Sequence, residues 1–198
     1  MNEAAILRFA GISAYFNALV FILSLVALMV FFSIGGIWGR VNDSLSIFWM
    51  LSYLPLAFAL FLVTRTVNYP ASLVSTLVGS AAALAFIVMQ VLLVLGRVQF
   101  EQTFSGVLTA TAVFGLFVLV HGFLGRAGHT LPSALSGVMI IYGIASVVGA
   151  IGFQIGGEQH PLAMIGLLLT ALSGLVWVIW FGRLLLAENA PTVLVRAP

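Results

Sequence analysis

The chain has 198 residues, of which 63% are hydrophobic and 6% charged, with seven basic residues (all arginine), five acidic residues and no cysteine. An ordinary soluble domain is about one quarter charged. This composition therefore excludes a soluble enzyme, a nucleic-acid-binding protein, a disordered chain and a disulfide scaffold. A polytopic membrane protein remains, with the lipid bilayer as a partner and no nucleic acid.

Six apolar runs are long enough to cross a bilayer, whose hydrocarbon core of about 30 Å needs about 20 residues of helix. None of them shows the alternating pattern of a transmembrane β-strand. We therefore predict a single all-α domain over residues 1–198, a polytopic transmembrane helical bundle. Its spans are predicted at residues 9–37, 45–63, 73–95, 104–124, 133–155 and 162–186.

The first run is too long for the core of a signal peptide, which spans about 7–15 residues. We expect it to remain as a membrane helix. It contains Asn17, whose amide costs free energy in hydrocarbon unless a neighbouring helix pairs it. Asn17 is therefore a candidate for lining a ligand site, although fixing the helix register is the favoured role. The phenylalanine-rich sides of the first two runs predict a surface that faces lipid or a partner protein.

The second run contains Tyr53, another ligand-lining candidate, and Pro55 near its middle. The proline ring clashes with the carbonyl of Leu51, which predicts a kink. A static bend is favoured over a gating hinge. Trp38 and Trp49 flank the loop that precedes this run, where interfacial aromatic anchors are expected.

The third run carries small residues at four-residue spacing, which marks places where membrane helices approach closely. Packing within the bundle is the favoured explanation, and a contact in a homo-oligomer or with another membrane protein stays open. Gln90, in the same run, is a ligand-lining candidate like Asn17. The stripe consists of Ala71, Ser75, Gly79 and Ala83, and similar stripes occur in the fifth and sixth runs.

The fourth run contains His121, the only histidine expected within a span, and the fifth contains Tyr142. Both are ligand-lining candidates. The other two histidines lie in different loops, so the three cannot form a zinc site or a pair of haem ligands. No acidic residue lies within a span to carry a proton or a cation. We therefore expect no metal, no cofactor and no catalytic residue.

The sixth run ends in Trp177, Trp180 and Arg183. Both tryptophans are predicted to anchor the helix at the inner membrane interface. Arg183, together with Arg65 and Arg126, is predicted to contact lipid headgroups there.

Arginines set the expected orientation, because short loops with positive charge stay cytoplasmic. We therefore predict that both termini face the cytoplasm. The inner arginines are then Arg8, Arg65, Arg126, Arg183 and Arg196, and the outer ones are Arg40 and Arg97. Most of the acidic residues are expected on the outer side: Asp43, Glu101 and Glu158 lie outside, and Glu3 and Glu188 lie inside.

Gly-Arg pairs close four of the six runs, and Arg40 precedes Arg97 by as many residues as Arg126 precedes Arg183. This spacing suggests an inverted repeat of three helices plus three, an arrangement common in transporters. However, the residues of the two halves match no better than by chance. Gly followed by Arg also suits the end of any helix at an interface.

The opening segment from Leu7 to Ile12 and the closing Trp-x-x-Trp-x-Gly-Arg segment from Trp177 to Arg183 resemble uncharacterised bacterial integral membrane proteins with six spans. The resemblance covers the first and last helices. It implies a location in the bacterial cytoplasmic membrane, as a multi-pass protein, and carries no activity.

The residues are compatible with three functions. The favoured one is a non-catalytic accessory or scaffold subunit, or a lipid-contacting protein, with a homo-oligomer or another membrane protein as partner. The alternative is a small transporter or channel for a neutral or lipophilic substrate, which requires a cavity between the two halves. The least favoured is a lipid-modifying enzyme that uses His121 and Arg126 at the inner interface.

Overall fold

The computed structural model describes residues 2–157 and 159–187, most of which lie in helices. The orientation assigned to Glu158, Glu188 and Arg196 falls outside these residues. The helices are α1 (Glu3–Ile34), α2 (Trp38–Leu51), α3 (Tyr53–Thr64), α4 (Tyr69–Val94), α5 (Phe100–Ala127), α6 (Ser133–Gly156) and α7 (Pro161–Leu186). With α2 and α3 counted as one span, six helices are long and apolar enough to cross a membrane. The predicted all-α bundle of six spans is confirmed.

The first two helices extend beyond the predicted bounds at their starts. α1 begins at Glu3, where the Asn2 side chain accepts a hydrogen bond from the backbone N–H of Ala5 at 2.9 Å. It ends before Gly35 and Gly36, whose positive φ angles of 68° and 70° suit glycine and turn the chain. α2 then starts at once, at Trp38. Hydropathy marks only the hydrocarbon part of a helix, whereas caps and glycines set its ends.

The second span is broken at Ser52, three residues before Pro55. The predicted kink is therefore present. The Asn17 amide of α1 donates to the Trp49 carbonyl and to the Ser52 hydroxyl, both at 2.8 Å. Neighbouring side chains commonly satisfy backbone groups at such breaks in membrane helices. These bonds hold the bend in place, which favours a static bend over a hinge.

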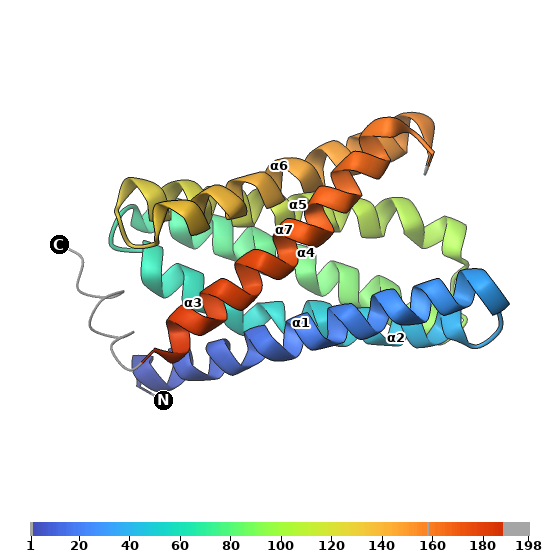
Figure 1. Ribbon diagram of the computed structural model, residues 1–198, viewed down its shortest axis with the longest axis horizontal. Helices are drawn as coiled ribbons and strands as arrows, with labels where there is room; N and C mark the ends of the chain where they lie inside the picture. The colour runs from blue at the N-terminus through green and yellow to red at the C-terminus, as the bar shows by residue number, and fades with distance from the viewer. Residues whose placement is uncertain (1, 158, 188–198) are drawn as a thin grey trace.

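The spans form a ring in chain order, because each packs against the next and α7 returns to α1. α3 lies deeper and contacts α1, α4 and α5. α1 begins and α7 ends at the same end of the bundle, where the two helices meet, and they diverge toward the other end (Figure 1). We call the first the basic end, since Arg8, Arg65, Arg126 and Arg183 lie there, and the other the opposite end. Which end faces the cytoplasm stays a prediction.

Both halves of the ring show the same order of contacts, with the middle span between the two outer ones. Any ring of six helices in chain order has this arrangement, whether or not its halves are related. The second span is broken at Ser52, whereas its counterpart α6 runs unbroken from Ser133 to Gly156. The inverted repeat therefore stays a prediction.

Small residues lie where helices cross. A Cβ atom on Gly182 would meet the backbone of Gly11 on α1, and one on Gly166 would meet the backbone of Gly149 on α6. Gly79 on α4 packs against the ring of Phe117 on α5. These contacts support packing within the bundle as the role of the stripes.

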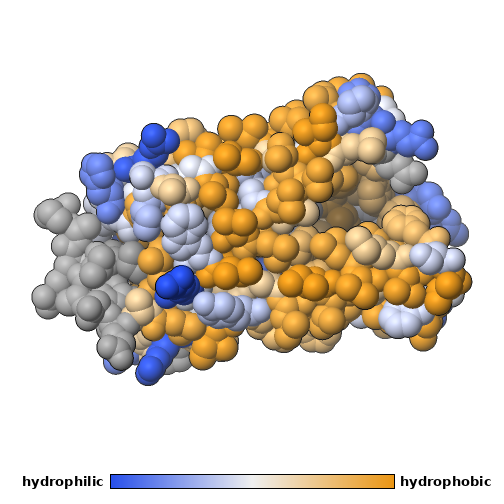
Figure 2. Space-filling view, in the orientation of Figure 1, coloured by the Kyte–Doolittle hydropathy of each residue, from blue (hydrophilic) through white to orange (hydrophobic). Residues whose placement is uncertain are grey.

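The outer surface is an apolar band with hydrophilic residues gathered at its two ends (Figure 2). In α1 only 28% of the most apolar stretch is buried, and large side chains such as Phe16 and Phe32 face outward. The span of α2 and α3 is the most enclosed, at 56%. The expected exposed surface is therefore present on α1, whereas the second span contributes only isolated residues such as Phe58. The enclosure of α3 by three neighbours explains the difference.

Candidate functional site

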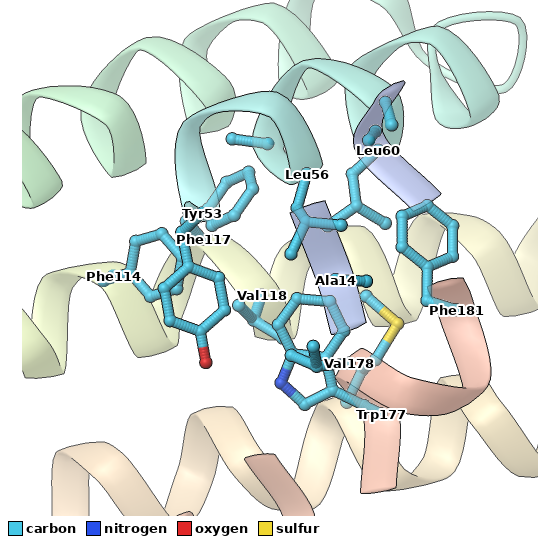
Figure 3. Packing of buried hydrophobic residues seen from close by; sticks show 14 of the residues in the cluster. Ala14, Tyr53, Leu56, Leu60, Phe114, Phe117, Val118, Trp177, Val178 and Phe181 are labelled. Carbon is cyan, nitrogen blue, oxygen red and sulfur yellow. The ribbon is translucent and has the colours of Figure 1, made fainter. Parts of the chain in front are cut away.

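Trp177 is buried inside the bundle, in a cluster that includes Tyr53 and Phe114 (Figure 3), and its ring contacts rings of two other spans. It stacks on Tyr53 of α3, with ring centroids 5.8 Å apart and planes at 18°, and meets Tyr142 of α6 edge-on at 6.0 Å. Phe114 of α5 lies 4.7 Å from Tyr53. We call Tyr53, Phe114, Tyr142 and Trp177 the aromatic centre. Such ring pairs stabilise a core by about 0.5–1.5 kcal/mol beyond their buried area.

Trp177 is 0% exposed, so its predicted role as an interfacial anchor is wrong. Trp180, one turn further along α7, is 36% exposed, as an anchor requires. The residues of α7 that face the other helices include Gly174, Trp177, Val178 and Phe181. Composition near a helix end does not tell which of two tryptophans faces inward, because that depends on the neighbouring helices.

Two polar atoms in the aromatic centre have no hydrogen-bond partner among the described residues: the Tyr142 hydroxyl and the Trp177 ring nitrogen. Both are buried. A buried hydroxyl without a partner costs about 1–3 kcal/mol relative to water. The centre is therefore built for ring packing rather than for a closed polar network.

Replacing Tyr142 with Phe is accordingly expected to leave the stability of the bundle unchanged or to raise it by up to about 1 kcal/mol. The ring and its contact with Trp177 stay, and only the unpartnered oxygen is lost. Unfolding in a titration with sodium dodecyl sulfate, followed by circular dichroism, measures the change. A loss of more than about 1 kcal/mol would show that the hydroxyl makes a stabilising bond in the membrane.

His121 lies in a second buried cluster, between α3, α4 and α5, and is 0% exposed. Its Nδ1 is 2.8 Å from the Thr64 hydroxyl, and its Nε2 is 3.1 Å from the Thr76 hydroxyl. Thr64 also lies 2.8 Å from the Ser72 hydroxyl and donates its proton to the Leu60 carbonyl at 2.8 Å. Thr64 then accepts from Nδ1–H, and Nε2 accepts from Thr76, which satisfies a neutral imidazole.

This cluster ties three helices together and leaves neither ring nitrogen of His121 free. Arg126, by contrast, is exposed at the end of α5. The two residues therefore do not form one open site, which argues against the lipid-modifying enzyme. The sequence reading missed Thr64, Ser72 and Thr76. Ser72 and Thr76 lie four residues apart on the buried face of α4, and that polar spacing was a usable signal.

The five ligand-lining candidates are all buried. Tyr53 and Tyr142 meet at Trp177, as described. Asn17 bonds to the backbone of Trp49, whose ring lies 5.6 Å from that of Tyr53. The His121 ring contacts Phe117, which in turn contacts Phe114 of the aromatic centre. Gln90 lies one turn beyond Phe86, whose ring contacts Trp49. Ring contacts therefore link Tyr53, Tyr142 and His121, whereas the buried side-chain oxygen of Gln90 has no hydrogen-bond partner among the described residues.

The predicted headgroup-contacting arginines lie at the basic end. Arg65 pairs with Glu3 at 2.6 Å, and both side chains are partly exposed. Exposed pairs of this kind contribute about 0–1 kcal/mol. Arg126 and Arg183 lie in the last turns of α5 and α7, where a positive charge complements the helix dipole.

Two hollows are found on the outer surface. The first, of about 370 Å³, lies along α7 and is lined by Leu175, Val176, Ile179, Trp180 and Arg183. The second, of about 510 Å³, lies between α4 and α5 and is lined by residues such as Ala82, Ala85, Gly106 and Ala110. The second hollow lies on the outer side of the junction between the two halves, since α4 ends the first half and α5 begins the second. A further depression in the apolar surface separates α7 from α1 toward the opposite end (Figure 2).

Within residues 2–157 and 159–187, no group of three histidine, aspartate or glutamate side chains is placed to hold a metal ion. No protein-family model matches the chain, and comparisons with curated proteins and with solved structures gave no significant match. The likeness to uncharacterised bacterial membrane proteins therefore stays a resemblance.

Proposed function

We propose that this multi-pass membrane protein is a non-catalytic accessory or scaffold subunit of the bacterial cytoplasmic membrane. The observation that carries the proposal is the filled interior. Trp177 and its neighbours are packed inside the bundle, and Asn17 and His121 bond to neighbouring helices. A protein built in this way acts through its outer surface.

The surface best suited to a partner is the outward face of α1. This helix has 32 residues, and the ring leaves most of its apolar side chains uncovered. Membrane helices associate through packing rather than through the hydrophobic effect. A long, weakly enclosed helix on a rigid bundle is a suitable contact for another membrane protein or for a second copy.

A photo-reactive amino acid at position 16 tests the proposal in the membrane of the source organism. Phe16 is exposed on α1, and Leu60, which is enclosed in α3, provides the matched control position. We expect position 16 to form a defined cross-linked product larger than the 21.1 kDa chain, and position 60 to form none. Cross-links to lipid alone, together with migration as a monomer on a native gel, would overturn the proposal.

A second candidate is a carrier or passive binder of a lipophilic molecule. One observation favours it: the depression between α1 and α7 opens sideways, toward the bilayer (Figure 2). A lipophilic compound that co-purifies in equal amount with the chain, and is lost when larger side chains fill the depression, would support this candidate over the scaffold.

A further inference from the structure

The residues that line the hollow along α7 change from apolar to polar along the helix axis. Leu175, Val176 and Ile179 line its part nearer the bilayer middle, and Trp180 and Arg183 line its part at the basic end. Positions three, four and eight apart lie on one side of a helix. The hollow is therefore apolar at one end and cationic at the other.

The length of this gradient suits one leaflet. The eight-residue step from Leu175 to Arg183 corresponds to about 12 Å of helix at about 1.5 Å per residue. Half of the hydrocarbon core is about 15 Å thick. With Arg183 at the level of the headgroups, Leu175 lies near the middle of the bilayer.

The chemistry of the two polar residues suits a phosphate group. A guanidinium can donate two parallel hydrogen bonds to phosphate oxygens. The indole of Trp180 adds one N–H donor on an amphipathic ring of the kind enriched at membrane interfaces. Arg183 and Trp180 are both exposed, so a ligand in the bilayer reaches them.

A second arginine adds positive charge nearby. Gly11 of α1 packs against Gly182 and Leu186 of α7. Arg8 lies one turn before Gly11 and is exposed at the same end of the bundle. The net charge of this region favours an anionic ligand over a zwitterionic one.

We propose that the α7 hollow binds an anionic glycerophospholipid from the leaflet at the basic end. The phosphate contacts Arg183, the glycerol region lies at Trp180, and one acyl chain follows Ile179, Val176 and Leu175. This site does not depend on the accessory role proposed above, since it lies on α7 rather than on the outward face of α1.

Tryptophan quenching by brominated lipids tests the site on the full chain reconstituted in vesicles. A background with Trp38→Phe and Trp49→Phe removes the exposed and the half-buried tryptophan of the second span, and Trp177 is buried, so quenching reports mainly on Trp180. Brominated phosphatidylglycerol and brominated phosphatidylcholine are each titrated into phosphatidylcholine vesicles. We expect the anionic lipid to bind about five-fold more tightly, the effect of one arginine at a membrane surface.

Arg183→Gln is expected to remove most of this preference, since only the charge of Arg8 stays, whereas Arg183→Lys should retain most of it because the charge at position 183 is kept. Arg126→Gln is the matched control: this arginine is also exposed in the last turn of a helix at the basic end, but outside the hollow. It should leave the five-fold preference unchanged. Equal binding of both lipids, a preference unaffected by Arg183→Gln, or an equal loss in both glutamine variants would overturn the proposal.

Discussion

Replacing Trp177 with alanine is expected to lower the free energy of unfolding by about 3–5 kcal/mol, the usual range for a buried aromatic residue. Trp177 is 0% exposed and contacts rings from α3 and α6. Its removal leaves a cavity where these spans meet, and the lost contacts include the stacked pair with Tyr53. A loss of this size is a large part of the stability of a typical domain.

Trp180→Ala is the matched control, because it removes the same side chain one turn away from an outward-facing position. We expect a change of less than about 1 kcal/mol. Both variants are compared by circular dichroism during unfolding in sodium dodecyl sulfate, and by elution from size-exclusion chromatography after heating. Similar losses in the two variants would show that the aromatic centre does not hold the bundle together.

The number and type of helices could be predicted because hydropathy reports directly on contact with hydrocarbon. The helix ends could not be predicted as well, because they depend on local chemistry. Gly35 and Gly36 end α1, while Arg40 and Asp43 are tolerated within α2. A charged residue near the membrane surface can stay helical since its side chain reaches water.

The burial of the polar candidates was also predictable, because a polar side chain in a span is stabilised only against other helices. The residues that surround these polar side chains could not be predicted. The threonines that bond to His121 come from α3 and α4, and the tyrosines that contact Trp177 come from α3 and α6. Such contacts join residues far apart in the chain, and a single sequence carries no record of them.

The break in the second span contributes to the packing of the aromatic centre. The break at Ser52 separates α2 from α3, and α3 then lies deep enough for Tyr53 to reach Trp177. Asn17 fixes the break from α1 by bonding to Trp49 and Ser52. The kink, for which the sequence already favoured a static bend, therefore helps to fill the interior, which agrees with a role that depends on a stable outer surface.

The close approach of α6 and α7 at Gly149 and Gly166, where backbone meets backbone, is also expected to be sensitive to substitution. A Cβ atom at Gly166 would lie 2.9 Å from the Ala145 carbonyl oxygen and closer still to the Gly149 backbone. A backbone cannot rotate away as a side chain can, so Gly166→Ala must push the helices apart. We expect a loss of about 2–3 kcal/mol, at the upper end of overpacking effects, despite the helix propensity that alanine adds.

Gly137→Ala provides the matched control, because a Cβ atom there meets nothing within 4 Å. Alanine is favoured over glycine within a helix by up to about 1 kcal/mol, so this variant should be neutral or more stable. The same unfolding titration measures both. If Gly166→Ala is as stable as Gly137→Ala, the two helices do not cross at Gly149 and Gly166. The inference that α6 and α7 are closely packed would then be wrong.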